Sequence, residues 1–267
     1  MKRNKLREAL NAGRPTVGTH IHSSWPSVVE IIGHTGVFDY IEFVAEYAPF
    51  DLFSLENVCR AAELLGLSSM IKLDQEPRRF LAQRSIGAGF DSVLFADCRN
   101  PDDVRECIRA VKPETPDAGG YHGVGVRRSS YVHGSGQSDY PQQLDDVVIA
   151  FMIEKRTAVD ALDEILALGG VDMVQWGPAD YALSIGRPGE FHAPDVRETE
   201  RRVIATCLEA GVPPRAEIES VDRAKYYLDL GVRHFCMGTD VMILYQFLRD
   251  QGEKLQDELG ETLGKAP

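Results

Sequence analysis

The sequence predicts a single (β/α)8 barrel, the TIM-barrel fold, over residues 1–267. The length of 267 residues lies in the range of a one-domain barrel. Short apolar runs alternate with amphipathic stretches from end to end, which is the pattern of repeated βα units around a parallel sheet. An open doubly wound sheet would show the same alternation. No Gly-x-Gly-x-x-Gly follows the first apolar run, however, so a dinucleotide-binding version of that fold has no support.

The eight predicted strands are short apolar runs. They cover residues 16–21, 40–44, 69–72, 92–96, 147–154, 173–176, 215–218 and 234–237. Eight strands joined by helices close most simply as a barrel.

Capping residues predict where several of the connecting helices begin and end. Asn100, followed by proline, is expected to cap one helix at its N-terminus. A second helix is expected to open at Thr157 and to stop at Gly169. A third is expected to be capped by Ser220 and to end at Gly231.

Two segments fall outside the repeated pattern. Residues 112–146 are rich in Gly, Pro, Ser and Tyr and are too long for a routine connection. We expect them to form a loop on the active-site side of the barrel, with a plain surface excursion as the alternative. Residues 241–263 are predicted to form an amphipathic C-terminal helix.

Composition narrows the possible partners. The formal charge of −12 opposes the phosphate backbone of nucleic acid, and no apolar run is long enough for a membrane helix. Small molecules are therefore the expected partners, in a cytoplasmic protein. The five cysteines are odd in number and lie in apolar patterns, which predicts buried thiols.

The strongest candidates for chemistry are two carboxylates that follow neighbouring predicted strands. Glu154 follows the apolar run Phe151-Met152-Ile153, and Asp180 follows a Gly-Pro turn after the next strand. In a barrel, residues at the carboxyl ends of the strands form the active site. Two carboxylates that converge there repel each other unless a cation or a proton lies between them. The pair therefore predicts a site for a hard divalent ion, with a helix cap or a surface acid as the alternative for either residue.

A second group of candidates follows the second and third strands. Glu46 and Tyr47 are candidates for proton transfer, and Lys72 for a fixed positive charge that stabilises an oxyanion. A Schiff-base role for Lys72 is a weaker alternative. His20, on the first strand, is a candidate for binding substrate, although a core histidine would fit the pattern as well.

These residues resemble those of the HpcH/HpaI family of metal-dependent class II pyruvate aldolases, within the phosphoenolpyruvate/pyruvate barrel superfamily. The specific element is a strand-end Glu followed about 25 residues later by Gly-Pro-Ala-Asp. Weaker matches extend the resemblance over nearly the whole chain: the N-terminal Lys5-Leu6-Arg7-Glu8-Ala9-Leu10, Glu46-Tyr47-Ala48-Pro49, His122-Gly123-Val124-Gly125 and Gly238-Thr239-Asp240.

The resemblance implies a metal-dependent aldolase. It places Mg2+, Mn2+ or Co2+ on Glu154 and Asp180, and the carboxylate of a 2-oxo acid near Gly177, Pro178 and Ala179. It implies an aldehyde as the second reaction partner. It also implies a homohexamer in which the C-terminal helix crosses between subunits.

The chain departs from the family pattern at four positions. Tyr47 stands where the family has the histidine associated with proton transfer, and Lys72 where it has an arginine that contacts the keto oxygen. Val44 and Ser85 replace two aspartates, the second of which a neighbouring subunit usually contributes. Both metal ligands remain, so the departures predict altered proton transfer at a retained metal site.

The leading hypothesis is a metal-dependent carbon–carbon lyase that acts on a 2-oxo acid through an enolate. Two alternatives stay open. One is another lyase, a decarboxylase or a hydrolase of a metal-chelating small acid. The other is a non-catalytic protein that binds 2-oxo acids.

Overall fold

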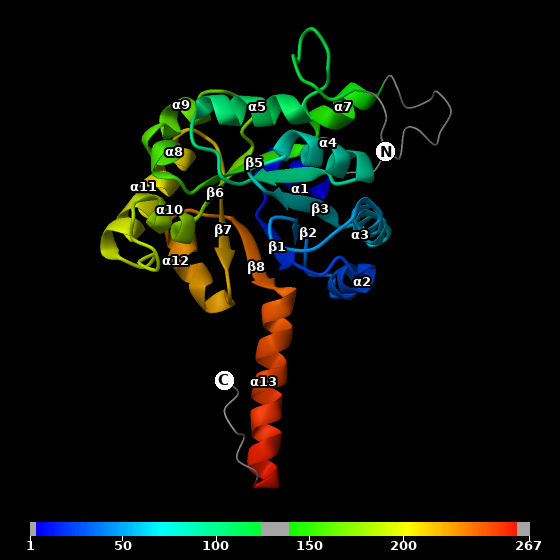
Figure 1. The fold of residues 1–267 in the computed structure, drawn as a ribbon, viewed down its shortest axis with the longest axis vertical. Helices are drawn as coiled ribbons and strands as arrows, with labels where there is room; N and C mark the ends of the chain where they lie inside the picture. Colours follow the sequence, from blue (N-terminus) through cyan, green and yellow to red (C-terminus); the bar gives the residue numbers. More distant parts are fainter. Residues whose placement is uncertain (1–3, 124–138, 261–267) are drawn as a thin grey trace.

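The predicted barrel is confirmed. The computed structural model describes residues 4–123 and 139–260, and its eight parallel strands close into a barrel in chain order (Figure 1). Each observed strand coincides with a predicted one, with small differences at the ends. The strands are β1 (Thr16–Ile21), β2 (Tyr40–Val44), β3 (Ser68–Leu73), β4 (Ser92–Phe95), β5 (Val148–Ile153), β6 (Met173–Trp176), β7 (Pro214–Ile218) and β8 (His234–Thr239).

Helices surround this barrel and join its strands. Between β1 and β5 lie α2 (Pro26–His34), α3 (Leu52–Leu64), α4 (Arg78–Ala88), α5 (Pro101–Val111) and α7 (Tyr140–Asp145). Between β5 and β8 lie α8 (Arg156–Asp160), α9 (Leu162–Leu166), α10 (Pro178–Ser184), α11 (Pro194–Glu209), the 3-10 turn η1 (Val221–Arg223) and α12 (Ala224–Asp229). Before β1 and after β8 lie α1 (Lys5–Asn11) and α13 (Asp240–Leu259).

The predicted caps are only partly correct. The Asn100 side chain accepts the Asp103 N–H as expected, at 2.9 Å. The helix expected to open at Thr157 instead begins at Arg156 and ends at Asp160, before α9 continues the same connection. Ser220 stands at the predicted N-cap position, but its side chain makes no capping hydrogen bond.

Side chains that alternate along each strand fill the barrel interior. Tyr40 is fully buried there, and its hydroxyl donates to the Phe235 carbonyl oxygen at 3.0 Å. Its ring fits because the opposite residue on β1 is Gly18: a Cβ at that position would lie 2.2 Å from the ring. All five cysteines are buried thiols, as predicted.

Helix α1 closes the amino-terminal end of the barrel. Leu6 is fully buried in the cluster that holds Tyr40, Met70 and Leu94. The Arg7 guanidinium bridges both carboxylate oxygens of Asp172 at 2.6 Å. The carboxyl ends of the strands, at the other end of the barrel, therefore form its open end.

The expectation that residues 112–146 border the active site is wrong for the described parts of that segment. The segment joins α5 to β5, so it leads into the amino-terminal end of a strand. The Asn4 side chain, at the start of α1, donates to the Asp146 carbonyl oxygen at 2.9 Å. Residues 112–123 and 139–146 therefore lie at the end that α1 closes, and residues 124–138 lie outside the described residues.

Helix α13 leaves the barrel directly from β8 and extends away from it as a long single helix (Figure 1). None of its residues is buried, although it carries large apolar side chains. Those with more than half of their surface exposed include Met242, Ile243, Leu244, Tyr245, Phe247, Leu248, Leu255 and Leu259. The predicted amphipathic helix is thus present, with its apolar face uncovered in the single chain.

Within residues 4–123 and 139–260, no helix combines the length and the apolar character that crossing a bilayer requires.

Candidate active site

Glu154 and Asp180 line one cavity of about 570 Å³ at the open end of the barrel. Glu154 directly follows β5 and is buried, whereas Asp180 lies in the first turn of α10, after β6. Gly177 lies between the two elements: a Cβ on it would be 2.5 Å from Glu154 Oε2. Only glycine at that position leaves room for the Glu154 carboxylate.

Two residues that the sequence did not single out complete this side of the cavity. The Asp97 N–H donates to Glu154 Oε1 at 2.8 Å. Lys155 Nζ pairs with Asp97 Oδ1 at 2.5 Å and with Asp180 Oδ1 at 2.9 Å. Asp97 adopts a left-handed backbone conformation, with φ of 58°. This conformation is uncommon for residues other than glycine and often occurs at functional sites.

The donors on this side of the cavity fit a hard divalent ion. Burial, with a smaller contribution from the nearby Asp180 carboxylate, raises the pKa of Glu154 to about 7, against the lowering by the Asp97 N–H and Lys72. A cation between Glu154 and Asp180 would favour the ionised form of Glu154. The single ammonium of Lys155 offsets only one of the two charges of Asp97 and Asp180, so this end of the cavity keeps a net negative charge that attracts cations. Carboxylate oxygens of this kind suit Mg2+ or Mn2+.

Lys72 faces this carboxylate pair from β3. Its ammonium lies 2.6 Å from Glu46 Oε2 and 5.1 Å from the centre of the Tyr47 ring. Burial opposes its charge, but Glu46 raises the pKa of Lys72 above its ordinary value. A lysine whose pKa is raised is a poor nucleophile at neutral pH, which argues against the Schiff-base alternative. The structure thus brings Lys72, Glu46 and Tyr47 together as one group.

Tyr47 is the least buried member of that group, with 61% of its surface exposed. Burial of its hydroxyl, together with the Glu46 carboxylate, raises the pKa of Tyr47 to about 12. At neutral pH it is therefore a hydrogen-bond donor and not a base. Ser85, which aligns with an aspartate of the family, is fully buried in α4 and donates to the Leu81 carbonyl oxygen at 2.7 Å, so it faces no cavity.

The remaining predicted substrate-binding residues also line the cavity. Gly177, Pro178 and Ala179 form its wall between β6 and α10. His20 lines it from β1 and is 4% exposed. His20 belongs to a larger polar group, because other strands of the barrel carry charged side chains that contact it.

A polar cluster, defined here as His20, Glu42, Gln175, Arg215 and Glu217, occupies the interior of the barrel below the cavity. His20 Nε2 lies 3.0 Å from Glu42 Oε1, and its Nδ1 lies 3.3 Å from Glu217 Oε1. Arg215 forms a buried ion pair with Glu42, and Gln175 Nε2 donates to Glu217 Oε2 at 3.1 Å. The cluster joins strands β1, β2, β6 and β7.

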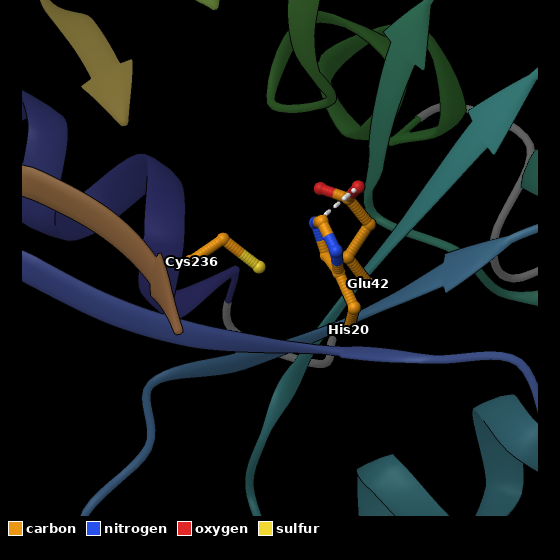
Figure 2. Close-up of side chains that lie close together, drawn as sticks. All are labelled: His20, Glu42 and Cys236. Atoms are coloured by element: carbon orange, nitrogen blue, oxygen red, sulfur yellow. Dashed lines mark ion pairs between the residues drawn. The ribbon is translucent and has the colours of Figure 1, made fainter. Parts of the chain in front are cut away.

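Within the described residues, three potential metal ligands come close together in this cluster. His20, Glu42 and Cys236 each offer a ligand atom, and these atoms lie within 4.8 Å of one another. Figure 2 shows the His20–Glu42 ion pair, with the Cys236 sulfur turned toward it. However, Arg215 and a protonated His20 already neutralise the carboxylates of Glu42 and Glu217. The cluster therefore has no net negative charge to attract a metal ion. Glu154 and Asp180 therefore stay the candidate metal ligands, and the cluster forms an internally neutral network.

Sequence reasoning missed several residues of this site. Asp97 follows an apolar strand just as Glu154 does, so the same criterion would have found it. Glu42, Arg215 and Glu217 each interrupt an apolar strand at an inward position. These charged positions can be seen in the sequence. Which side chains contact one another depends on the strand register, which sets His20 opposite Glu42 and Gln175 opposite Arg215.

Comparison with known proteins agrees with this geometry. Residues 17–245 match the family model for HpcH/HpaI aldolase/citrate lyase. A hydroxypyruvate/pyruvate aldolase from Roseovarius nubinhibens is 31% identical over 252 residues, covering 92% of this chain and 94% of that protein. A 4-hydroxy-2-oxo-heptane-1,7-dioate aldolase from Escherichia coli is 28% identical over 90% of each chain.

A solved structure shows the same fold over nearly the same length. The crystal structure of an HpcH/HpaI aldolase/citrate lyase family protein from Burkholderia cenocepacia is 27% identical. It aligns with a TM-score of 0.86 over 95% of this chain and 100% of that one. The predicted resemblance is thus confirmed, and this chain belongs to the HpcH/HpaI aldolase/citrate lyase family, as a carbon–carbon lyase of the class II aldolase type.

Proposed function

We propose that this lyase cleaves a 2-oxo acid with a hydroxyl group on C4 into a smaller 2-oxo acid, such as pyruvate or hydroxypyruvate, and an aldehyde. The observation that carries the proposal is the placement of Glu154 at the end of β5 and of Asp180 in the first turn of α10, after β6, with Lys72 lining the same cavity. The named aldolase activities of the two relatives support the same substrate class.

Glu154 and Asp180 would hold a divalent ion, with Mg2+, Mn2+ and Co2+ as the candidates. Such an ion would supply Lewis-acid polarisation of the substrate's keto oxygen. The Asp97 N–H fixes the orientation of the Glu154 carboxylate, and Lys155 fixes that of Asp180. The orientation of both ligands is therefore set before an ion enters.

Lys72 would stabilise the negative charge that develops on the keto oxygen when the C3–C4 bond breaks. Its pairing with Glu46 keeps the ammonium protonated and limits its motion. A fixed cation aimed at developing charge in a largely buried site is a large catalytic contribution. Tyr47, beside it, would donate a hydrogen bond and not accept a proton. Gly177, Pro178 and Ala179 would contact the substrate carboxylate.

The direct test is exchange of the pyruvate methyl protons for deuterium, followed by NMR in the presence of Mn2+ or Mg2+. We expect exchange with the wild type and a loss of about a hundredfold or more in Glu154→Gln and in Asp180→Asn. Lys72→Met should bind the metal but lose about 10²- to 10³-fold in exchange rate, and Lys72→Arg should retain more of it.

The same assay separates the alternatives. Tight oxalate binding without exchange under any divalent ion would favour a non-catalytic binding protein. Exchange without cleavage of any 4-hydroxy-2-oxo acid would favour another reaction of a metal-chelating acid on the same site.

We also propose that a second copy of this chain covers the apolar face of α13, giving a homo-oligomer. The support is the length of the helix and its row of exposed large apolar side chains, which a monomer in water does not usually display. The hexamer implied by the family resemblance, and the cytoplasmic location, stay predictions.

A further inference from the structure

The wall of the cavity formed by β7 carries an ionised carboxylate that the proposed reaction does not use. Glu217 belongs to the polar cluster, yet its side chain is 49% exposed and lines the cavity. The strand residues on either side of it, Ala216 and Ile218, are buried. An exposed carboxylate on the inner wall of a barrel needs partners that hold it there.

Both carboxylate oxygens of Glu217 contact side chains from the barrel interior. His20 Nδ1 lies 3.3 Å from Oε1, and Gln175 Nε2 donates to Oε2 at 3.1 Å. Gln175 is almost fully buried, and His20 is fixed in turn by Glu42. Each carboxylate oxygen can accept more than one hydrogen bond, so Glu217 keeps acceptor capacity toward the cavity. Its orientation is set before any ligand binds, which lowers the entropic cost of binding.

The charge state of Glu217 decides which groups it can recognise. Burial opposes its ionisation, but the hydrogen bond from His20 and the charge of His20 lower the pKa of Glu217 below its ordinary value. An ionised carboxylate only accepts hydrogen bonds, so it favours donors and repels acids. It is also a weak base, which argues against a proton-transfer role.

The nearby charges favour a neutral donor over a cationic one. Lys72 acts electrostatically on Glu217 and also on Glu154, so the lysine lies within range of both sides of the cavity. Arg215 lies on the same strand as Glu217 and also lines the cavity. An ammonium group would meet these two cations, whereas a hydroxyl group would not. The 2-oxo acid half of the substrate belongs with Glu154 and Asp180, which leaves the β7 side for the other half.

We propose that Glu217, held by His20 and Gln175, is a subsite for hydroxyl groups on the aldehyde half of the substrate. The preferred substrates are then 2-oxo acids with a hydroxylated tail, and not those with an acidic or purely apolar tail. This inference rests on the proposed aldolase function. It goes further because it assigns the second half of the substrate to a chemical class.

The experiment compares two acceptor aldehydes of nearly equal size in aldol addition to pyruvate. Glycolaldehyde carries a hydroxyl where propanal carries a methyl group. We expect the wild type to prefer glycolaldehyde by about 10- to 100-fold in kcat/KM, the range given by one hydrogen bond to a charged group. Glyoxylate, an acidic acceptor of similar size, should be poorer than glycolaldehyde. In Glu217→Gln the preference for glycolaldehyde over propanal should fall by about tenfold.

Two control measurements show whether a changed aldehyde preference comes from misfolding or from the loss of a negative charge. Deuterium exchange into pyruvate needs no aldehyde, so it should stay within about threefold of the wild-type rate in Glu217→Gln, showing a folded and enolising enzyme. The matched control is Glu219→Gln, which removes the same charge from the same wall of the cavity without the contacts to His20 and Gln175. It should leave the aldehyde preference unchanged.

The outcomes distinguish the two proposals. If the wild type shows no exchange, the aldolase proposal is wrong and the aldehyde subsite falls with it. If exchange is normal but Glu217→Gln keeps the wild-type preference, the subsite alone is overturned. An equal loss of preference in Glu219→Gln would also overturn it, because the effect would then be one of overall charge.

Discussion

Lys155 places an ammonium group between two carboxylates at the proposed metal site. It pairs with Asp97 and Asp180, one of which is a proposed ligand. The lysine can act in two opposite ways: it holds Asp180 in position, and it repels an incoming cation. At the few-ångström separations involved, charge repulsion in a partly buried site amounts to several kcal/mol, which exceeds the benefit of orienting one side chain.

We therefore predict that Lys155→Met binds Mn2+ about tenfold more tightly than the wild type, as measured by titration calorimetry. Lys225→Met, which breaks an exposed pair with Asp229, serves as the control and should leave the affinity unchanged. Weaker binding in Lys155→Met would mean that orientation of Asp180 dominates.

Gly177 offers a second test at the scale of single residues. In Gly177→Ala the added methyl group would meet the Glu154 carboxylate, which must move away from its place beside the Asp97 N–H. We expect Mn2+ affinity to fall by about 10- to 100-fold, the range seen when the support of a metal ligand is lost. Gly87→Ala is the matched control, because a Cβ at Gly87 meets nothing within 4 Å and its helix tolerates alanine. Unchanged affinity in Gly177→Ala would show that Glu154 has room to shift.

At the scale of the element, α13 is a helix whose apolar face has no partner in its own chain. Phe247 and Leu248, near its middle, are 62% and 60% exposed. Burial of such side chains in an interface contributes roughly 1.5–3 kcal/mol each, so a charge at this point should disrupt an assembly.

We predict that Phe247→Glu dissociates the assembly into smaller species in light scattering coupled to size-exclusion chromatography. Gln246→Glu, the neighbouring position on the same helix, should not change the mass. Equal masses for the wild type and Phe247→Glu would count against a role of this face in assembly.

The elements also show what sequence could and could not predict. Strand positions came directly from apolar runs, because the parallel strands of a barrel are buried on both faces. The direction of the 112–146 segment was misjudged because length alone does not distinguish a loop after a strand from a loop before one. Glu154 was found because it directly follows a strand, and Asp180 because it follows the next strand after a short Gly-Pro turn. Glu217 was missed because its importance depends on His20 and Gln175, which lie far away in the sequence.

On the scale of the whole molecule, the polar cluster links strands on either side of the β8–β1 pairing that closes the barrel. Glu42 on β2 pairs with Arg215 on β7, with β1 and β8 between them. Burial opposes the ionisation of Glu42, but Arg215 and His20 lower its pKa from 4.5 to about 2. A carboxyl group with a lowered folded-state pKa contributes stability at neutral pH, and that stability is lost as the pH falls from about 4.5 toward 2.

We predict that Glu42 contributes about 2 kcal/mol less stability at pH 3 than at pH 7, because its carboxyl is then protonated in the unfolded chain but still ionised in the folded protein. Urea unfolding with EDTA present should show this loss in the wild type, beyond the loss in a Glu42→Leu/Arg215→Leu variant. The double substitution removes both charges and leaves neither one unpaired. Parallel pH profiles for the two proteins would show that the pair does not control acid stability.

The internal neutrality of that cluster has a consequence for how the family can diversify. Replacing Glu42 or Arg215 alone leaves a fully buried charge without a partner, at a cost of several kcal/mol. Glu42 and Arg215 are therefore expected to be inherited together or lost together. Relatives that carry Glu42 and Arg215 as a pair would form a lineage separate from those with an apolar barrel interior, whatever each lineage retains at Glu154 and Asp180.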